Sequence, residues 1–205
     1  MALLQQLAGC ALAGGDSASE ADTALGQGRM GLALVWMMTH PWLPITGGIT
    51  APQGFQAAGI TAGLKASGRA DLALLLAPID AVCGGSFTTN RVRAACVDLC
   101  AQRLQESSGM ARAVLINSGQ ANACTGDRGL IDSQRATKAV ADQLGLSEQD
   151  VLICSTGVIG VPIPMPTLLA GLAPLVEALD NAGGDAAANA ILTTDLVDKQ
   201  VALEL

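Results

Sequence analysis

Two apolar runs in the second half of the chain each end in a stretch of small polar residues. Residues 113–116 are followed by NSGQANACTG at 117–126, and residues 151–154 are followed by STGVIG at 155–160. Short apolar runs with such boundaries are typical of strands. We expect turns there to carry hydroxyl, amide and glycine N–H groups, a common way to build a small-molecule site.

The rest of the pattern predicts strands intermixed with helices. Runs 71–77 and 81–88, separated by Pro78 and Asp80, predict a strand, a tight turn and a second strand. Residues 94–104 fit a strand or a strand-to-helix passage. Apolar stripes predict three helices, which cover 130–144 before Gly145, 166–179 from Pro166, and a shorter Ala-rich stretch from Gly183 to about Leu192. An α/β or α+β layered domain follows.

The first 43 residues differ from this pattern, and we predict a poorly organised N-terminal extension at 1–43 before a domain at 44–205. Residues 12–29 are small, polar and acidic. Residues 30–38 are apolar but much shorter than the roughly 20 residues that span a bilayer. Residues 1–16 contain no Lys or Arg before their apolar stretch, unlike a secretory signal. Neither a membrane nor an export role is expected.

Composition excludes several classes of function. The net charge of −7, with two Phe, two Trp and no Tyr, offers little to phosphate backbones or stacked bases, so nucleic acid is not an expected partner. His40 is the single histidine, which excludes Ser-His-Asp triads, Cys-His pairs and two-histidine zinc sites. The six cysteines lack C-x-x-C spacing, so we expect them to behave as small buried hydrophobic residues. This use of cysteine fits a reducing, cytoplasmic compartment.

Five strings carry a family resemblance: ITAPQGF at 49–55, FTTNRV at 87–92, NSGQANACTG at 117–126, STGVIGVPIPM at 155–165 and TTD at 193–195. In order and spacing they resemble the ornithine acetyltransferase family, also called the bifunctional glutamate N-acetyltransferase family, of arginine biosynthesis. The resemblance covers about three quarters of the chain. It implies an α+β layered sandwich with mixed sheets and flanking helices, of the N-terminal-nucleophile type.

The resemblance also implies site residues. In the family, the threonine and glycine of STG form the oxyanion hole, roles that fall on Thr156 and Gly157. One hydroxyl and one unhindered N–H can hold the charged oxygen of a tetrahedral intermediate. The first threonine of TTD contacts the amino-acid substrate, which makes Thr193 a binding candidate and Thr194 a second one. On residues alone, STG also fits a plain turn and TTD a helix stop.

Other polar residues keep two interpretations. Residues 117–119 and Asn122 could bind a ligand or shape a loop. Arg91 could face a substrate carboxylate or be solvated. Lys65, Arg69 and Asp71 suggest a charged turn, to which we assign no chemistry.

By resemblance, the complete enzyme moves acetyl from N-acetylornithine, and in bifunctional members from acetyl-CoA, to glutamate. A threonine freed by autocatalytic cleavage within Met-Ala-Thr-Met-Leu is the nucleophile, and no metal or redox cofactor is implied. Because that string is absent here, we expect a truncated alpha chain whose nucleophile lies beyond Leu205.

A beta chain from the same precursor would complete an alpha2-beta2 assembly. The chain alone should expose an apolar face and dissolve poorly. Two alternatives stay open: an inactive fragment or partner subunit, and a threonine-type amidase or aminopeptidase of similar fold.

Overall fold

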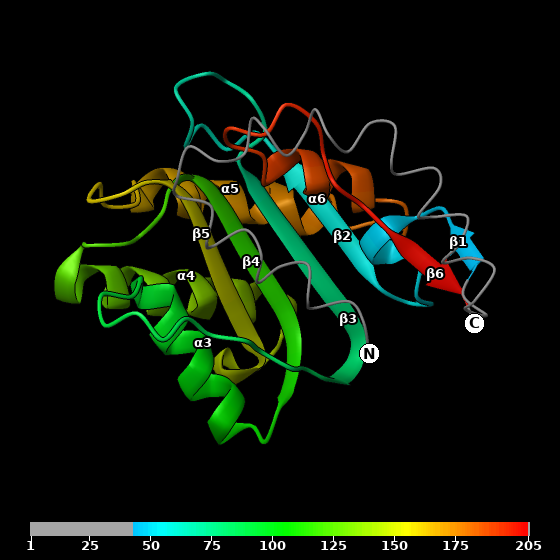
Figure 1. The fold of residues 1–205 in the computed structure, drawn as a ribbon, viewed down its shortest axis with the longest axis horizontal. Coiled ribbons are helices and arrows are strands. Elements are labelled where there is room, and N and C mark those ends of the chain that lie inside the picture. The colour runs from blue at the N-terminus through cyan, green and yellow to red at the C-terminus, as the bar shows by residue number, and fades with distance from the viewer. Residues whose placement is uncertain (1–42, 205) are drawn as a thin grey trace.

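The computed structural model describes residues 43–204, which form a mixed four-stranded sheet with helices packed against it (Figure 1). The strand order is β2-β3-β4-β5, antiparallel except for the parallel β4–β5 pair. A second, two-stranded sheet pairs β1 with β6. The strands are β1 (Leu43–Ile45), β2 (Gln56–Ile60), β3 (Leu72–Val82), β4 (Met110–Gln120), β5 (Val151–Val158) and β6 (Ala202–Glu204).

Four α-helices accompany the sheet. They are α3 (Ala95–Glu106), α4 (Gly126–Leu144), α5 (Met165–Glu177) and α6 (Gly184–Ala190), with short 3₁₀ turns η2 (Gly48–Thr50) and η3 (Glu148–Asp150). Helix α4 lies in the crossover that the parallel pair β4–β5 requires. None of the helices within residues 43–204 has the length and apolar character needed to cross a membrane. The layered α/β architecture is the one expected from the sequence.

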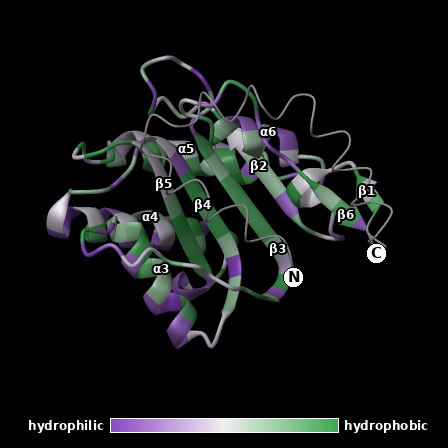
Figure 2. Ribbon diagram, in the orientation of Figure 1, coloured by the Kyte–Doolittle hydropathy of each residue, from purple (hydrophilic) through white to green (hydrophobic). Residues whose placement is uncertain are grey.

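Successive strand residues point to opposite sides, and this alternation divides the core into two clusters. The first face packs against α3, α4 and α5, and its strand residues include Leu72, Leu74, Ala113, Leu115, Val151 and Ile153. The second face packs against α6, with Ala57, Ala73, Leu75 and Ile116 facing Ala187 and Ala190. Figure 2 shows the resulting hydrophobic colour along the central strands.

The helix predictions are confirmed. Helix α4 ends at Gly145, whose φ of 66° is the left-handed conformation of a common helix stop. Helix α5 has Pro166 in its first turn, where the missing N–H costs no hydrogen bond. The ambiguous segment 94–104 forms α3.

The predicted strand, turn and strand over 71–88 is wrong. A single strand, β3, passes through Pro78 and Asp80 with an irregular register between Leu76 and Ala81. The partner strand β2 pairs with β3 only as far as Leu76, so the missing N–H of Pro78 breaks no ladder bond there. Arg112 donates from Nε to the Ala77 carbonyl, at 3.3 Å. The irregularity therefore absorbs the proline without reversing the chain.

The strands before the two polar stretches run further than predicted. β4 continues to Gln120 and β5 to Val158. The parallel ladder aligns Ser118 with Thr156 and Gly119 with Gly157. The residues that we expected in turns therefore lie inside the sheet, where their positions are set by the ladder.

The predicted extension at 1–43, apart from Leu43, lies outside the described residues, as do His40 and Cys10. The proposed boundary between 43 and 44 stays a prediction.

Candidate active site

A cavity of about 430 Å³ lies beside the β4–β5 half of the sheet. Its floor includes Val114 and Ile116 of β4 and residues 152–157 of β5, and its walls are the 83–94 loop, the start of α3 and Ile191 after α6. Thr156 and Gly157, to which the resemblance assigns the oxyanion hole, are both in the lining.

Glycine is required at the paired positions 119 and 157. Gly157 has φ of 131° and Gly119 has φ of 126°, a region that side chains rarely allow. A Cβ on Gly157 would overlap the backbone of Gly119. The two strands therefore approach each other at the cavity with bare backbone, which explains the glycine without any catalytic role.

β5 is the last strand of the sheet, and side chains of α3 bond to its outer edge. Arg103, which is 3% exposed, donates from Nη1 to the carbonyl of Val151. The Cys100 thiol donates to the carbonyl of Ile153 at 3.2 Å and accepts from its N–H at 3.3 Å. These bonds satisfy backbone groups that a fifth strand would otherwise pair.

The same edge becomes open at Gly157. The N–H of Ser155 bonds to the Cys96 thiol. The carbonyl of Val158 points the other way and accepts from the N–H of Ala121 at 2.9 Å. Because N–H groups alternate along a strand, the N–H of Gly157 points to the same side as that of Ser155. α3 begins at Ala95, so the partners that α3 supplies to this edge end there. We infer that the Gly157 N–H points toward the cavity that Gly157 lines.

The Thr156 hydroxyl completes a pair of neutral donors. Thr156 is half-buried, and no hydrogen bond within residues 43–204 engages its hydroxyl. Of the described residues that line the cavity, Arg93 alone is charged, and its Nε is paired with Asp98 at 2.7 Å. A cavity with donors and no carboxylate suits an oxygen that gains negative charge.

The thiols around the cavity are held in the neutral form. Burial raises the pKa of the Cys83 and Cys96 thiols, and raises that of Cys100 to about 11. Desolvation penalises the thiolate in each case, with Ser155 opposing it at Cys96. These cysteines therefore behave as small buried hydrophobes, as predicted, although Cys124 is exposed.

The two predicted binding threonines lie outside the cavity lining. Thr193 is half-buried and Thr194 is exposed, both in the segment after α6. Ile191, two residues before Thr193, is in the lining. The arrangement brings the segment to the rim of the site. Arg91 is exposed and does not line the cavity.

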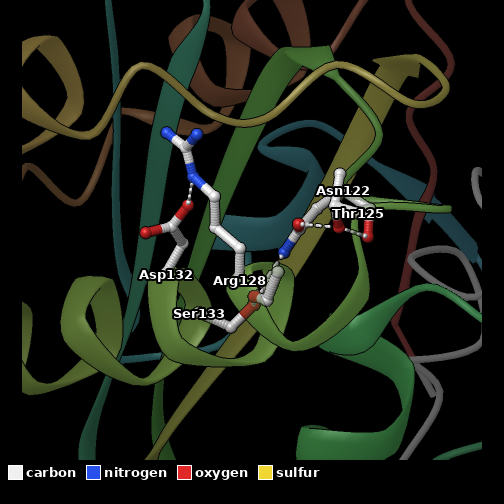
Figure 3. A network of polar contacts seen from close by, with 6 residues as sticks. Asn122, Thr125, Arg128, Asp132 and Ser133 are labelled. Carbon is white, nitrogen blue, oxygen red and sulfur yellow. Dashed lines mark hydrogen bonds and ion pairs between the residues drawn. The ribbon is translucent and has the colours of Figure 1, made fainter.

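The candidate asparagines are used inside the fold. Asn122 is 1% exposed, with φ of 50°, and its Nδ2 donates to the Gly129 carbonyl and to Ser133 Oγ at 3.0 and 2.8 Å. Its Oδ1 accepts from the Thr125 hydroxyl at 2.8 Å (Figure 3). Asn117 accepts from Ser155 Oγ at 2.6 Å. Of the two interpretations, loop and strand shaping therefore holds in this structure.

The sequence predicted a charged turn at Lys65, Arg69 and Asp71 but not the role of these residues beside the site. Asp71 is fully buried, and its carboxylate accepts four backbone N–H groups from residues 62–65. Burial, with Arg69 nearby, lowers the pKa of Lys65, and Asp71 opposes that shift. The available signal was an Asp at the start of an apolar strand, directly after a turn that carries two cations.

No group of three His, Cys, Asp or Glu side chains within residues 43–204 is arranged to hold a metal ion.

Comparison with known proteins identifies the family. The ArgJ family model matches residues 56–205. The arginine biosynthesis bifunctional protein ArgJ of Parasynechococcus marenigrum strain WH8102 is 75% identical over 167 residues, which are 82% of this chain and 41% of that protein. The protein of the same name from Prochlorococcus marinus strain MIT 9313 is 72% identical over 80% of this chain and 38% of its own length. The chain thus spans about two fifths of these relatives.

Solved structures match the fold. The ornithine acetyltransferase from Mycobacterium tuberculosis, solved in complex with ornithine, has a TM-score of 0.75 and 46% identity, covering 79% of this chain and 88% of that one. The arginine biosynthesis bifunctional protein ArgJ from Bacillus halodurans has a TM-score of 0.73 and 36% identity, covering 78% and 83%. The chain belongs to the ArgJ family.

Proposed function

We propose that this chain supplies the oxyanion hole of an acetyltransferase that moves acetyl from N-acetylornithine to glutamate through a threonyl acetyl-enzyme. One observation carries the proposal: Thr156, whose hydroxyl has no hydrogen bond among residues 43–204, and Gly157 line one cavity in an ArgJ-family chain. The solved ornithine acetyltransferase complexed with ornithine supports the substrate class.

The reaction proceeds in two halves. A threonine hydroxyl from a segment outside these residues attacks the acetyl carbonyl, and the carbonyl electrons move to the oxygen, where Thr156 and Gly157 stabilise the charge. Collapse breaks the C–N bond, and ornithine leaves with a proton returned by the base that activated the threonine. The glutamate amine then attacks the acetyl-threonine ester through a second oxyanion and regenerates the hydroxyl.

Acetyl-CoA is proposed as a second acetyl donor, because the relatives are named bifunctional. It would enter the same first half-reaction with a thiol as leaving group. We propose no metal or redox cofactor, since acyl transfer through a hydroxyl nucleophile needs neither.

Thr193 is the proposed contact for the amino-acid part of the substrate, with Thr194 as a second candidate. The support is position: Ile191 lines the cavity, and Thr193 follows it at the rim, half-buried.

A beta chain from the same precursor is the proposed partner, in an alpha2-beta2 assembly in the cytoplasm. The support is the apolar surface near the site. Val158 and Ile159 at the end of β5 are 59% and 65% exposed, and Leu196 and Val197 after the threonines are 96% and 66% exposed. Exposed apolar side chains that form a patch favour a protein interface.

The test is ornithine-dependent acetyl exchange by this chain co-expressed with the remaining part of the 75% identical relative. Thr156→Ala should lower kcat by about 10²-fold or more, because one of two oxyanion donors is lost. Thr167→Ala is the matched control, since Thr167 is another half-buried threonine, on α5 at the opposite face. An active wild type that tolerates Thr156→Ala would reduce Thr156 to a strand residue, and an inactive wild type would favour a non-catalytic chain.

A further inference from the structure

Backbone carbonyls from two distant parts of the chain accept all the hydrogen bonds that the Lys65 ammonium group can donate. Its Nζ donates to Ala70 at 2.7 Å, to Ala190 at 3.3 Å and to Leu192 at 2.6 Å. An ammonium has three donors, and all three are used. No carboxylate of residues 43–204 lies within ion-pair distance of it. Two of the three acceptors belong to the end of α6 and the residues after it, more than 120 residues away in sequence.

The backbone that carries Lys65 is itself fixed. Asp71 accepts the N–H groups of Ala62, Gly63, Leu64 and Lys65 at 2.7, 3.1, 2.6 and 2.9 Å. A buried carboxylate with four such bonds holds the turn in one conformation. The backbone from which the Lys65 side chain extends is therefore rigid.

The turn at residues 62–65 lies against β4, the strand next to the one that carries the oxyanion residues. Gln120 Nε2 donates to the Leu64 carbonyl at 3.0 Å, and a Cβ on Gly119 would come within 3.4 Å of Lys65 Cγ. Gly119 is the ladder partner of Gly157. Lys65 is thus joined through β4 to the strand that carries the oxyanion hole.

The other end of the connection is the segment that leads to Thr193. Ser118, the ladder partner of Thr156, donates from Oγ to the same Ala190 carbonyl that Lys65 contacts. Arg69 Nη2 donates to the carbonyl of Thr193 itself at 3.2 Å. Both contacts place the 190–193 segment against the 62–71 turn and β4.

We propose that Lys65 is a positioning residue, which sets the distance between Thr193 and the Thr156–Gly157 oxyanion hole and thereby the affinity for the amino-acid substrate. The inference rests on the proposed function. Lys65 touches neither the substrate nor the reacting atoms in this proposal, and acts through the carbonyls of Ala190 and Leu192.

The test uses the co-expressed enzyme and compares Lys65→Met with Thr193→Ala and the double variant. Met keeps the length and removes all three donors. KM for N-acetylornithine should rise about tenfold while kcat changes less than threefold, because ground-state and transition-state binding are lost together. In the double variant, Lys65→Met should add little to Thr193→Ala, since both act on one contact.

Lys65→Arg should give a smaller rise in KM, because a planar guanidinium keeps the charge but cannot reach three separate carbonyls equally. It carries the test if the Met variant does not fold. Lys138→Met is the control at an exposed lysine of α4 paired with Asp142, and it should leave KM unchanged. Equilibrium titration with ornithine supplies a readout that does not depend on turnover.

Unchanged KM and ornithine affinity in both Lys65 variants would overturn the inference. So would fully additive effects with Thr193→Ala, which would mark Lys65 as a general support for the fold. Wild-type enzyme with no exchange activity would instead overturn the proposed function, so the two failures are distinguishable.

Discussion

The second face of the sheet is closed over β2 and β3 and open over β4 and β5. On the closed half, α6 lies in direct contact with the strands. Two glycines allow this contact, because a Cβ on Gly59 would overlap the backbone of Ala186 and a Cβ on Gly183 would overlap the backbone of Ala57. On the open half, Val114, Ile116 and Cys154 line the cavity. The same alternation of residues underlies both halves, so the difference lies in what covers them.

The two outer edges of the sheet differ in the same way. The edge of β2 is satisfied by backbone, because Ala57 and Asp180 exchange N–H to carbonyl bonds at 3.0 and 3.1 Å. The edge of β5 is satisfied by side chains of Arg103 and Cys100, and only as far as the start of α3. Among residues 43–204, the edge of the closed half is therefore satisfied by main chain, and the edge of the open half by side chains that end at the start of α3.

The largest expected effect is on the closed half. Gly59→Ala should lower the free energy of unfolding by about 3 kcal/mol or more, because the new Cβ meets the Ala186 carbonyl, which cannot move independently of α6. Gly84→Ala at the cavity rim is the matched control, with nothing within 4 Å of its Cβ. Urea unfolding of both variants measures the difference. Equal losses would contradict the division between the halves.

A smaller effect is expected at the edge of β5. Burial raises the pKa of Cys100 to about 11 from an ordinary value near 9. The thiol stays protonated in the folded chain over the interval in which it ionises in the unfolded chain. Its contribution is complete below about pH 9 and is lost as the pH rises to about 11, a loss of about 2 to 3 kcal/mol.

Urea unfolding at pH 8 and pH 11 measures this loss. Cys100→Ser should reduce the dependence on pH without abolishing it, because burial also raises the pKa values of Cys83 and Cys96. Cys124→Ser, at an exposed position, should leave the dependence unchanged. An identical pH profile in wild type and Cys100→Ser would show that this thiol is not protected by the fold.

The sequence could predict the parts of this molecule that depend on local pattern. The helices α4 and α5 follow from apolar stripes with Gly145 and Pro166 at their ends. The turn predicted at Pro78 was wrong, because whether a strand can contain this proline depends on how far β2 extends opposite β3. That extent is a property of the sheet and is not visible in the segment itself.

The candidate site could be predicted only in part. Thr156 and Gly157 became candidates through the family resemblance, since STG alone favours a plain turn. The contacts of Lys65 could not be predicted, because its acceptors at 190 and 192 come near it only in the folded chain. Asn122 could bind a ligand or shape a loop until its contacts with α4 were known.

The smallest expected effect compares one substitution on the two halves. Ala73 on β3 is fully buried beneath α6, so Ala73→Ser introduces an unpaired hydroxyl and should cost about 1 to 2 kcal/mol of unfolding free energy. Ala121 lines the cavity and is half-buried, so Ala121→Ser should cost less than about 0.5 kcal/mol because water can reach the hydroxyl. Thermal unfolding of the two variants separates these values. If Ala121→Ser were as costly as Ala73→Ser, the β4–β5 half would be as closed to solvent as the half beneath α6, and the cavity could not admit a substrate without first opening.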